Sequence, residues 1–228
     1  MNSKSSIKNL LNLSIPIFFA NLAVPLVAIV DTGLMGNLDN AKYLTATSIA
    51  SALFSMIFWS FGFLRMGTVG MVSQADGSKK YNEIVHLVFR NISFVIIISC
   101  FLVLLQNFIF NLGIRIFNLT ENTEKYFKDY FYIRIYSSFG ELTIFLITGL
   151  FIGLQKTKTS SLVVVFFSIT NIIFSSLFVL HFNLDVKGVA LGTLVSSTIT
   201  SIIFLIYTFS ELKKFKKLNI NIKQIFNF

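Results

Sequence analysis

The chain alternates between long apolar runs and short polar segments. Five runs contain no charged residue and reach at least 20 residues each: 9–30, 43–64, 91–114, 159–184 and 188–210. A helix of about 20 residues crosses the ~30 Å apolar core of a bilayer. A sixth apolar run, 131–153, has a similar length but contains Arg134 and Glu141. The pattern predicts six transmembrane helices.

With their flanks, the six spans are expected at 9–34, 43–72, 86–112, 125–153, 159–182 and 187–210. Residues 1–210 are therefore predicted to form one all-α membrane domain, a six-helix bundle. Residues 211–228 are predicted to form a basic cytoplasmic tail. The first apolar run is too long for the core of a signal peptide, and no small-residue cleavage site follows it, so we interpret it as the first span.

Basic residues in the loops and at the span ends are distributed unevenly. Eleven belong to segments on one side of the predicted membrane: Lys4, Lys8, Lys79, Lys80, Lys156, Lys158, Lys213, Lys214, Lys216, Lys217 and Lys223. Five belong to the other side, where acidic residues match them: Lys42, Arg115, Lys125, Lys128 and Lys187. The positive-inside rule places the side with eleven in the cytoplasm. Because the number of spans is even, both termini are expected there.

The composition favours a membrane protein and narrows its partners. Hydrophobic residues make up 54% of the chain and charged residues only 13%, whereas soluble domains carry about 25% charged residues. The net charge of +9 follows from the cytoplasmic lysines, which suit anionic lipid. We therefore expect contact with membrane lipid and no nucleic-acid partner.

No residues are arranged for a chemical reaction. The sequence contains neither a GxxxxGK[ST] nucleotide-binding loop nor a GxSxG hydrolase elbow. Its single Cys100 and its two well-separated histidines, His86 and His181, offer no disulfide and no recognisable metal pair. We expect no enzyme activity and no metal or other cofactor.

One carboxylate, one amide and two hydroxyls are predicted to share a layer in the outer half of the membrane. Asp31 lies inside the first span, where a charged side chain costs roughly 2.5–3.5 kcal/mol. It lies about 9 Å below the outer end of its span, and Ser175 and Thr193 lie at similar depths in spans five and six. Asn171 shares a helix face with Ser175, one turn deeper. These groups suit a proton or Na⁺; the alternative is a structural role for Asp31, bonded to a neighbouring helix or lying in the headgroup layer.

Two further charges and two prolines lie inside the spans. Arg65 and Glu141 are each roughly 21–23 Å from the cytoplasmic lysines that follow them. They are expected to form an ion pair between spans two and four, or else to face water in a central cavity. Pro16 and Pro25 remove backbone hydrogen bonds from the first span, either as passive kinks or as a bend that moves with Asp31.

Four sequence segments carry a family resemblance. They are "SIPIFFANLAVPLVAIVDTGLMGNLD", "FLRMGTVGMVSQADG", "GLFIGLQKTK" and "NIIFSSLFVLHFNLDVKGVALGT". With these segments the chain resembles the N-terminal half of the multidrug and toxic compound extrusion (MATE) family, in its DNA-damage-inducible protein F branch. The resemblance extends over essentially the whole chain, in the expected order and spacing.

The resemblance implies a drug antiporter of twelve helices, in which two six-helix lobes are related by a pseudo-twofold axis along the membrane normal. A proton or Na⁺ bound in the N-terminal lobe drives the export of small organic cations. The family's acid in helix one corresponds to Asp31, and its Asn and Thr in helices five and six correspond to Asn171 and Thr193. Its helix-one proline, whose bend is linked to protonation, corresponds to Pro16. The family's helix-five Asp falls on Ser175, so one of two carboxylates is replaced and strong Na⁺ binding is less expected.

The chain stops in what resembles the linker between the lobes. It is therefore expected to act as a half transporter with a second six-helix lobe, separately encoded or a second copy, in the inner membrane of a bacterium. Two alternatives remain at this point: a related flippase for lipid-linked or polysaccharide substrates, and a truncated membrane module that does not transport.

Overall fold

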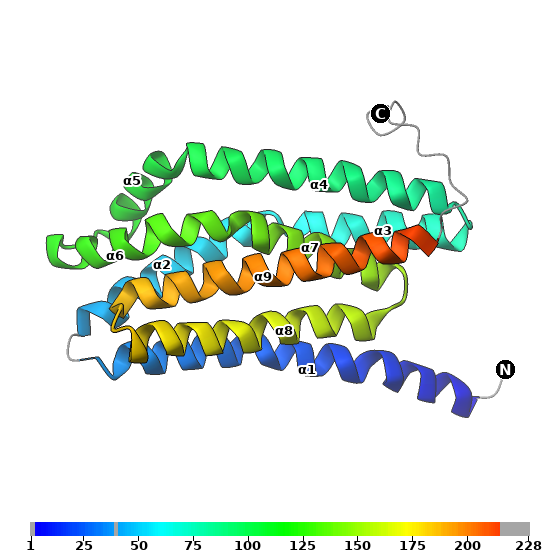
Figure 1. Cartoon of the computed structure of the whole chain (residues 1–228), viewed down its shortest axis with the longest axis horizontal. Coiled ribbons are helices and arrows are strands. Elements are labelled where there is room, and N and C mark those ends of the chain that lie inside the picture. Colours follow the sequence, from blue (N-terminus) through cyan, green and yellow to red (C-terminus); the bar gives the residue numbers. More distant parts are fainter. Residues whose placement is uncertain (1–2, 39–40, 215–228) are drawn as a thin grey trace.

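The protein is a bundle of long helices, seen here as a computed structural model that describes residues 3–38 and 41–214, with side chains from Ser14 onward. The α-helices are α1 (Ser3–Gly36), α2 (Ala41–Ser60), α3 (Gly62–Gly77), α4 (Tyr81–Leu104), α5 (Gln106–Phe117), α6 (Glu121–Arg134), α7 (Ser138–Gly153), α8 (Thr157–Ser176) and α9 (Asp185–Lys214). A 3₁₀ turn, η1 (Ile135–Ser137), joins α6 to α7, and a π-helical turn, η2 (Leu177–His181), follows α8. The long helices lie side by side, with α1 and α4 at opposite edges (Figure 1).

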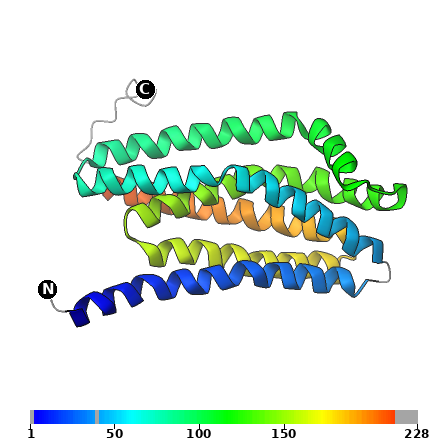
Figure 2. The same cartoon turned by 180° about the vertical axis from the view of Figure 1, so that it is seen from behind.

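Six segments of the described chain are long and apolar enough to cross a membrane, as predicted. They are Ser14–Gly36, Ala41–Gly77, Tyr81–Leu104, Glu121–Gly153, Thr157–His181 and Asp185–Lys214. Two of these spans are composite. The second consists of α2 and α3, which meet at Phe61, and the fourth consists of α6, η1 and α7 (Figure 2).

The third span ends earlier than predicted. The span was predicted at 86–112, but α4 ends at Leu104 and α5 leaves its line as a separate helix (Figure 1). An aromatic cluster accounts for the turn, because the ring of Phe110 lies 5.6 Å from that of Phe127, and the ring of Phe131 lies 5.3 Å from that of Phe54. These rings hold α5, α6 and α2 together and so fix the position of α6 beside the candidate site.

Small residues allow the inner helices to touch backbone to backbone. α8 packs between α1 and α9, and α7 packs against α3 and α9. A Cβ placed on Gly140 would lie 2.8 Å from the backbone carbon of Ser197, so α7 and α9 are in direct contact there. Close approach through small residues is a common way for membrane helices to associate, since lipid offers no hydrophobic force between them.

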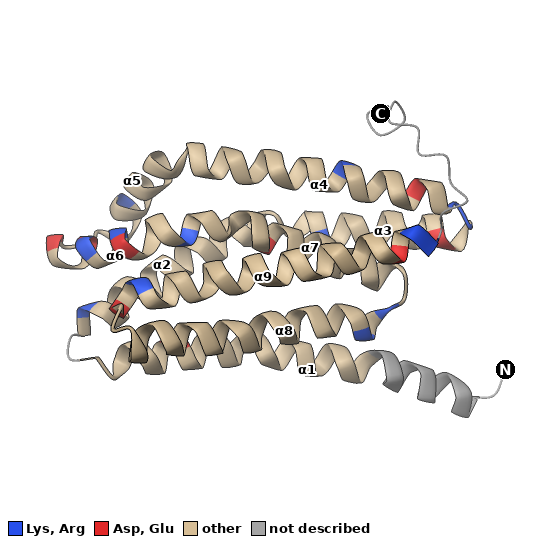
Figure 3. Ribbon diagram, in the orientation of Figure 1, with Lys and Arg blue, Asp and Glu red and all other residues tan. Residues whose placement is uncertain are grey.

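Charged residues gather at the two ends of the bundle (Figure 3). At the end where α1 begins and α9 ends, Lys156 and Lys214 both form ion pairs with the buried Glu211, joining the start of α8 to the end of α9. At the other end, Lys187 Nζ lies 3.6 Å from Asp129 Oδ1. The predicted tail begins inside α9, which extends to Lys214, and residues 215–228 lie outside the described residues.

Candidate ion-coupling site

A cavity of about 290 Å³ lies in the bundle, with walls from α1, α2, α6, α7, α8 and α9. Its polar lining includes one or two side chains from each of these helices: Asp31, Ser51, Tyr130, Arg134, Glu141, Asn171 and Thr193. The structure therefore brings Asp31, Asn171 and Thr193 to one cavity, although their helices are far apart in the sequence.

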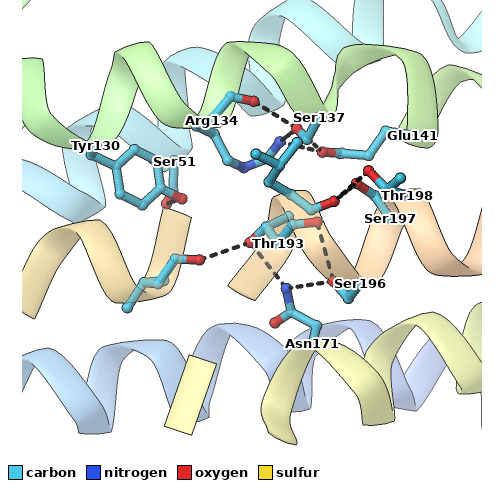
Figure 4. Close-up of polar contacts among 12 residues, drawn as sticks. Ser51, Tyr130, Arg134, Ser137, Glu141, Asn171, Thr193, Ser196, Ser197 and Thr198 are labelled. Atoms are coloured by element: carbon cyan, nitrogen blue, oxygen red, sulfur yellow. Dashed lines mark hydrogen bonds and ion pairs between the residues drawn. The ribbon is translucent and has the colours of Figure 1, made fainter. Parts of the chain in front are cut away.

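Asn171 and Thr193 form a buried hydrogen-bonded pair between α8 and α9 (Figure 4). The Asn171 amide nitrogen donates to Thr193 Oγ1 at 3.0 Å and to Ser196 Oγ at 3.4 Å. The Thr193 hydroxyl in turn donates to the backbone carbonyl of Val189 at 3.2 Å. Both donor groups, the Asn171 amide nitrogen and the Thr193 hydroxyl, are therefore bonded to atoms of α9. The Asn171 amide oxygen remains available to another partner.

Three oxygens around Asp31 have no hydrogen-bond partner among the described residues. They are Asp31 Oδ1, Asn171 Oδ1 and Ser175 Oγ, and each of these atoms is buried. An unpartnered buried polar atom is costly, and in native proteins it usually indicates an unseen water or ion. Acceptor oxygens from a carboxylate and an amide, with a hydroxyl, can receive a small cation, and an Asp31 carboxyl that holds a proton can donate to the amide oxygen.

Ser175 lies beside the cavity rather than in its wall. It is fully buried, and it is close enough to Asp31 to act on the carboxylate. A Cβ placed on Gly192 would lie 2.3 Å from Ser175 Oγ and 2.6 Å from Ser175 N, so α9 presses directly on this residue. The helix-five position at which the resemblance implies an acid therefore carries a tightly enclosed hydroxyl.

The predicted ion pair between Arg65 and Glu141 is wrong, because another arginine is the partner of Glu141. Glu141 pairs with Arg134, and Ser137 Oγ donates to the same carboxylate at 2.9 Å (Figure 4). Arg134 and Glu141 belong to one span and lie two helical turns apart, on one face, with the η1 turn between them. Arg65 lies half-buried on α3, and its side chain is not part of the cavity wall.

Arg134 and Tyr130 are site residues that the sequence interpretation did not assign. The Arg134 guanidinium carbon lies 5.0 Å from the ring centre of Phe54 and 5.4 Å from that of Phe58, within the range of a cation–π contact. The Tyr130 hydroxyl lies 3.2 Å from Ser51 Oγ. The spacing of Arg134, Ser137 and Glu141 at i, i+3 and i+7 was the signal that could have identified this cluster.

Pro16 is remote from the cavity along the same helix. It lies fifteen residues before Asp31, which corresponds to roughly 22 Å. α1 remains helical through both Pro16 and Pro25. A bend at Pro16 that follows protonation of Asp31 stays a prediction.

Comparisons with known proteins show which family the chain is similar to. Residues 16–177 match the family model MatE. The chain is 28% identical over 209 residues to DNA damage-inducible protein F of Escherichia coli (strain K12), covering 92% of this chain and 46% of that protein. It is 23% identical over 219 residues to the multidrug export protein MepA of Staphylococcus haemolyticus (strain JCSC1435), covering 96% and 48%.

Among solved structures, an outward-facing multidrug resistance MATE family transporter of the MOP superfamily superposes with a TM-score of 0.85 at 18% identity. The match covers 97% of this chain and 48% of that chain. The chain thus spans about half the length of the curated relatives it matches, and its six-helix bundle has the fold of one half of such a transporter.

Proposed function

Because this chain belongs to the MatE family, we propose that it is the N-terminal lobe of a multidrug efflux antiporter, in which Asp31 exchanges a proton or Na⁺ for the export of small organic cations. The observation that supports this most is the position of Asp31. Its half-buried carboxylate faces a polar cavity that the Asn171–Thr193 pair also lines. A charged group inside a membrane span is costly, and such residues commonly line ion pathways.

The proposal includes a second six-helix lobe as partner. The relatives named above have about twice the length of this chain, and their names describe export proteins or a DNA damage-inducible protein. A second lobe, separately encoded or a second copy of this chain, would cover the faces that a single lobe leaves exposed. We propose a multi-pass position in the bacterial inner membrane with both termini in the cytoplasm, in keeping with the lysines at that end of the bundle.

Proton release upon addition of ethidium tests the proposal, in liposomes that contain the chain together with a second lobe. Asp31→Asn should abolish the release while membrane insertion is kept, because loss of a buried charge removes a desolvation cost. Asp129→Asn is the matched control, because it makes the same chemical change at a carboxylate outside the cavity wall, where Asp129 contacts Lys187. Proton release in Asp31→Asn equal to that of the control would exclude Asp31 from the mechanism.

A further inference from the structure

The cavity holds three charged side chains, and one of them is a cation. Among the described residues of its wall, Asp31, Arg134 and Glu141 are charged, and Tyr130 is the remaining titratable group. The lining residues from α2, α8 and α9 are all uncharged. With every carboxyl ionised, the cavity therefore carries one net negative charge, which belongs to Asp31 once Arg134 and Glu141 are counted as a pair.

Arg134 is held firmly at the cavity wall. Its guanidinium donates to Glu141 and Ser137, and it lies over the rings of Phe54 and Phe58. Its side chain is only 11% exposed. Bonds to a carboxylate and contacts with aromatic faces use the planar fork that distinguishes arginine from lysine. The arrangement fixes a positive charge in the wall of the cavity that Asp31 also lines, from a different helix.

We propose that Arg134 is a positioning residue for the coupling ion: held by Glu141, it is the built-in counter-cation that Asp31 faces after releasing its proton. The proposal rests on the proposed function, since it takes Asp31 as the group that exchanges the ion. In the step itself, the O–H bond of the Asp31 carboxyl breaks, the proton passes to water, and a carboxylate remains. Arg134 keeps all its protons, and its positive charge stabilises the new carboxylate.

Infrared titration of the purified chain in detergent tests this directly, with the protonated-carboxyl band of Asp31 identified by its loss in Asp31→Asn. Arg134→Gln removes the counter-cation, so Asp31 should hold its proton to a higher pH, by about one unit or more, equal to a tenfold change in proton affinity. Glu141→Gln removes the competing carboxylate, so the midpoint should shift to lower pH. The double variant loses one charge of each sign and should return close to the unaltered chain.

Two controls separate this electrostatic role from a structural one. Arg65→Gln removes a half-buried arginine outside the cavity wall and should leave the midpoint in place, and Arg134→Lys, which keeps the charge, should do nearly the same. Shifts of the same sign in Arg134→Gln and Glu141→Gln would overturn the proposal. If Arg134→Gln does not fold, a Glu141→Gln midpoint that is unchanged or higher would overturn it equally. An unaltered chain in which no Asp31 band titrates would contradict the proposed function instead.

Discussion

Replacement of Gly192 by alanine should disturb the candidate site through a single methyl group. The added Cβ would lie 2.6 Å from Ser175 N and 2.7 Å from Ser175 Cα, both of them backbone atoms of α8. Ordinary contacts begin near 3.4 Å, so α8 and α9 would have to separate by about 0.8 Å. No rotation of a side chain can relieve this contact, since the obstacle is the helix itself. The separation would stretch the 3.0 Å bond from Asn171 to Thr193, which joins the same two helices.

Overpacking of this kind costs about 1–3 kcal/mol in stability. Gly70→Ala is the matched control, because nothing lies within 4 Å of a Cβ at Gly70 on α3. There the exchange should stabilise the helix by about 0.5–1 kcal/mol through its intrinsic preference for alanine. Gly192 also lies inside a helix and gains the same preference, so the two variants should differ by the overpacking cost alone, about 1–3 kcal/mol.

Unfolding of each purified variant by sodium dodecyl sulfate in mixed micelles, followed by circular dichroism, measures this difference. The infrared band of Asp31 provides the second measurement, because Ser175 lies beside that carboxylate. We expect Gly192→Ala to change both the unfolding midpoint and the Asp31 titration, and Gly70→Ala to leave the titration unaltered. Equal stability and identical titration of the two variants would refute the contact between Gly192 and Ser175.

Three further predictions concern the ion, the topology and the assembly. Ser175→Asp should strengthen Na⁺ binding, measured with radioactive Na⁺ in detergent, because it adds a second carboxylate beside Asp31; unchanged binding would show that position 175 does not contribute to the site. In a background without Cys100, a cysteine at Ser78 should react with an impermeant maleimide only from the cytoplasm and one at Asn122 only from outside, and the reverse result would invert the topology. The chain alone, as a monomer by its mass in detergent, should not export dye from vesicles, and export by a monomer would contradict the need for a second lobe.

The membrane spans and the layer of Asp31 were readable from the sequence. Lipid offers no hydrogen-bond partners, so the backbone polar groups of a spanning segment must bond within their own helix. An apolar run of sufficient length is therefore expected to be helical. Depth then follows from a rise of about 1.5 Å per residue, and this arithmetic placed Asp31 and Thr193 close enough to line one cavity. The partners of Asn171 on α9 follow from the same arithmetic combined with an antiparallel pair of helices.

The pairing of Glu141 could not be read in this way, because depth alone does not say which way a side chain points around its helix. Depth favoured Arg65 as the partner of Glu141, because Arg134 lies seven residues, roughly 10 Å, from Glu141 along its own helix. The rotation of the helices decides for Arg134. Rotation of span four is set by the η1 turn and by the aromatic cluster around Phe131, which are tertiary features. The early end of α4 has the same origin, since Phe110 is drawn to that cluster and the apolar pattern gives no sign of it.

Ser175 and Arg134 both limit the net negative charge of the cavity. A second acid at 175 would give the cavity a net charge of two when ionised, which suits a metal cation held by several oxygens. Ser175 keeps that charge at one, and Arg134 ensures that Glu141 does not raise it again. One uncompensated carboxylate, enclosed by uncharged walls of α2, α8 and α9, requires only one proton to become neutral. The replaced acid is therefore consistent with an active site that exchanges a single proton, and it does not by itself indicate that function has been lost.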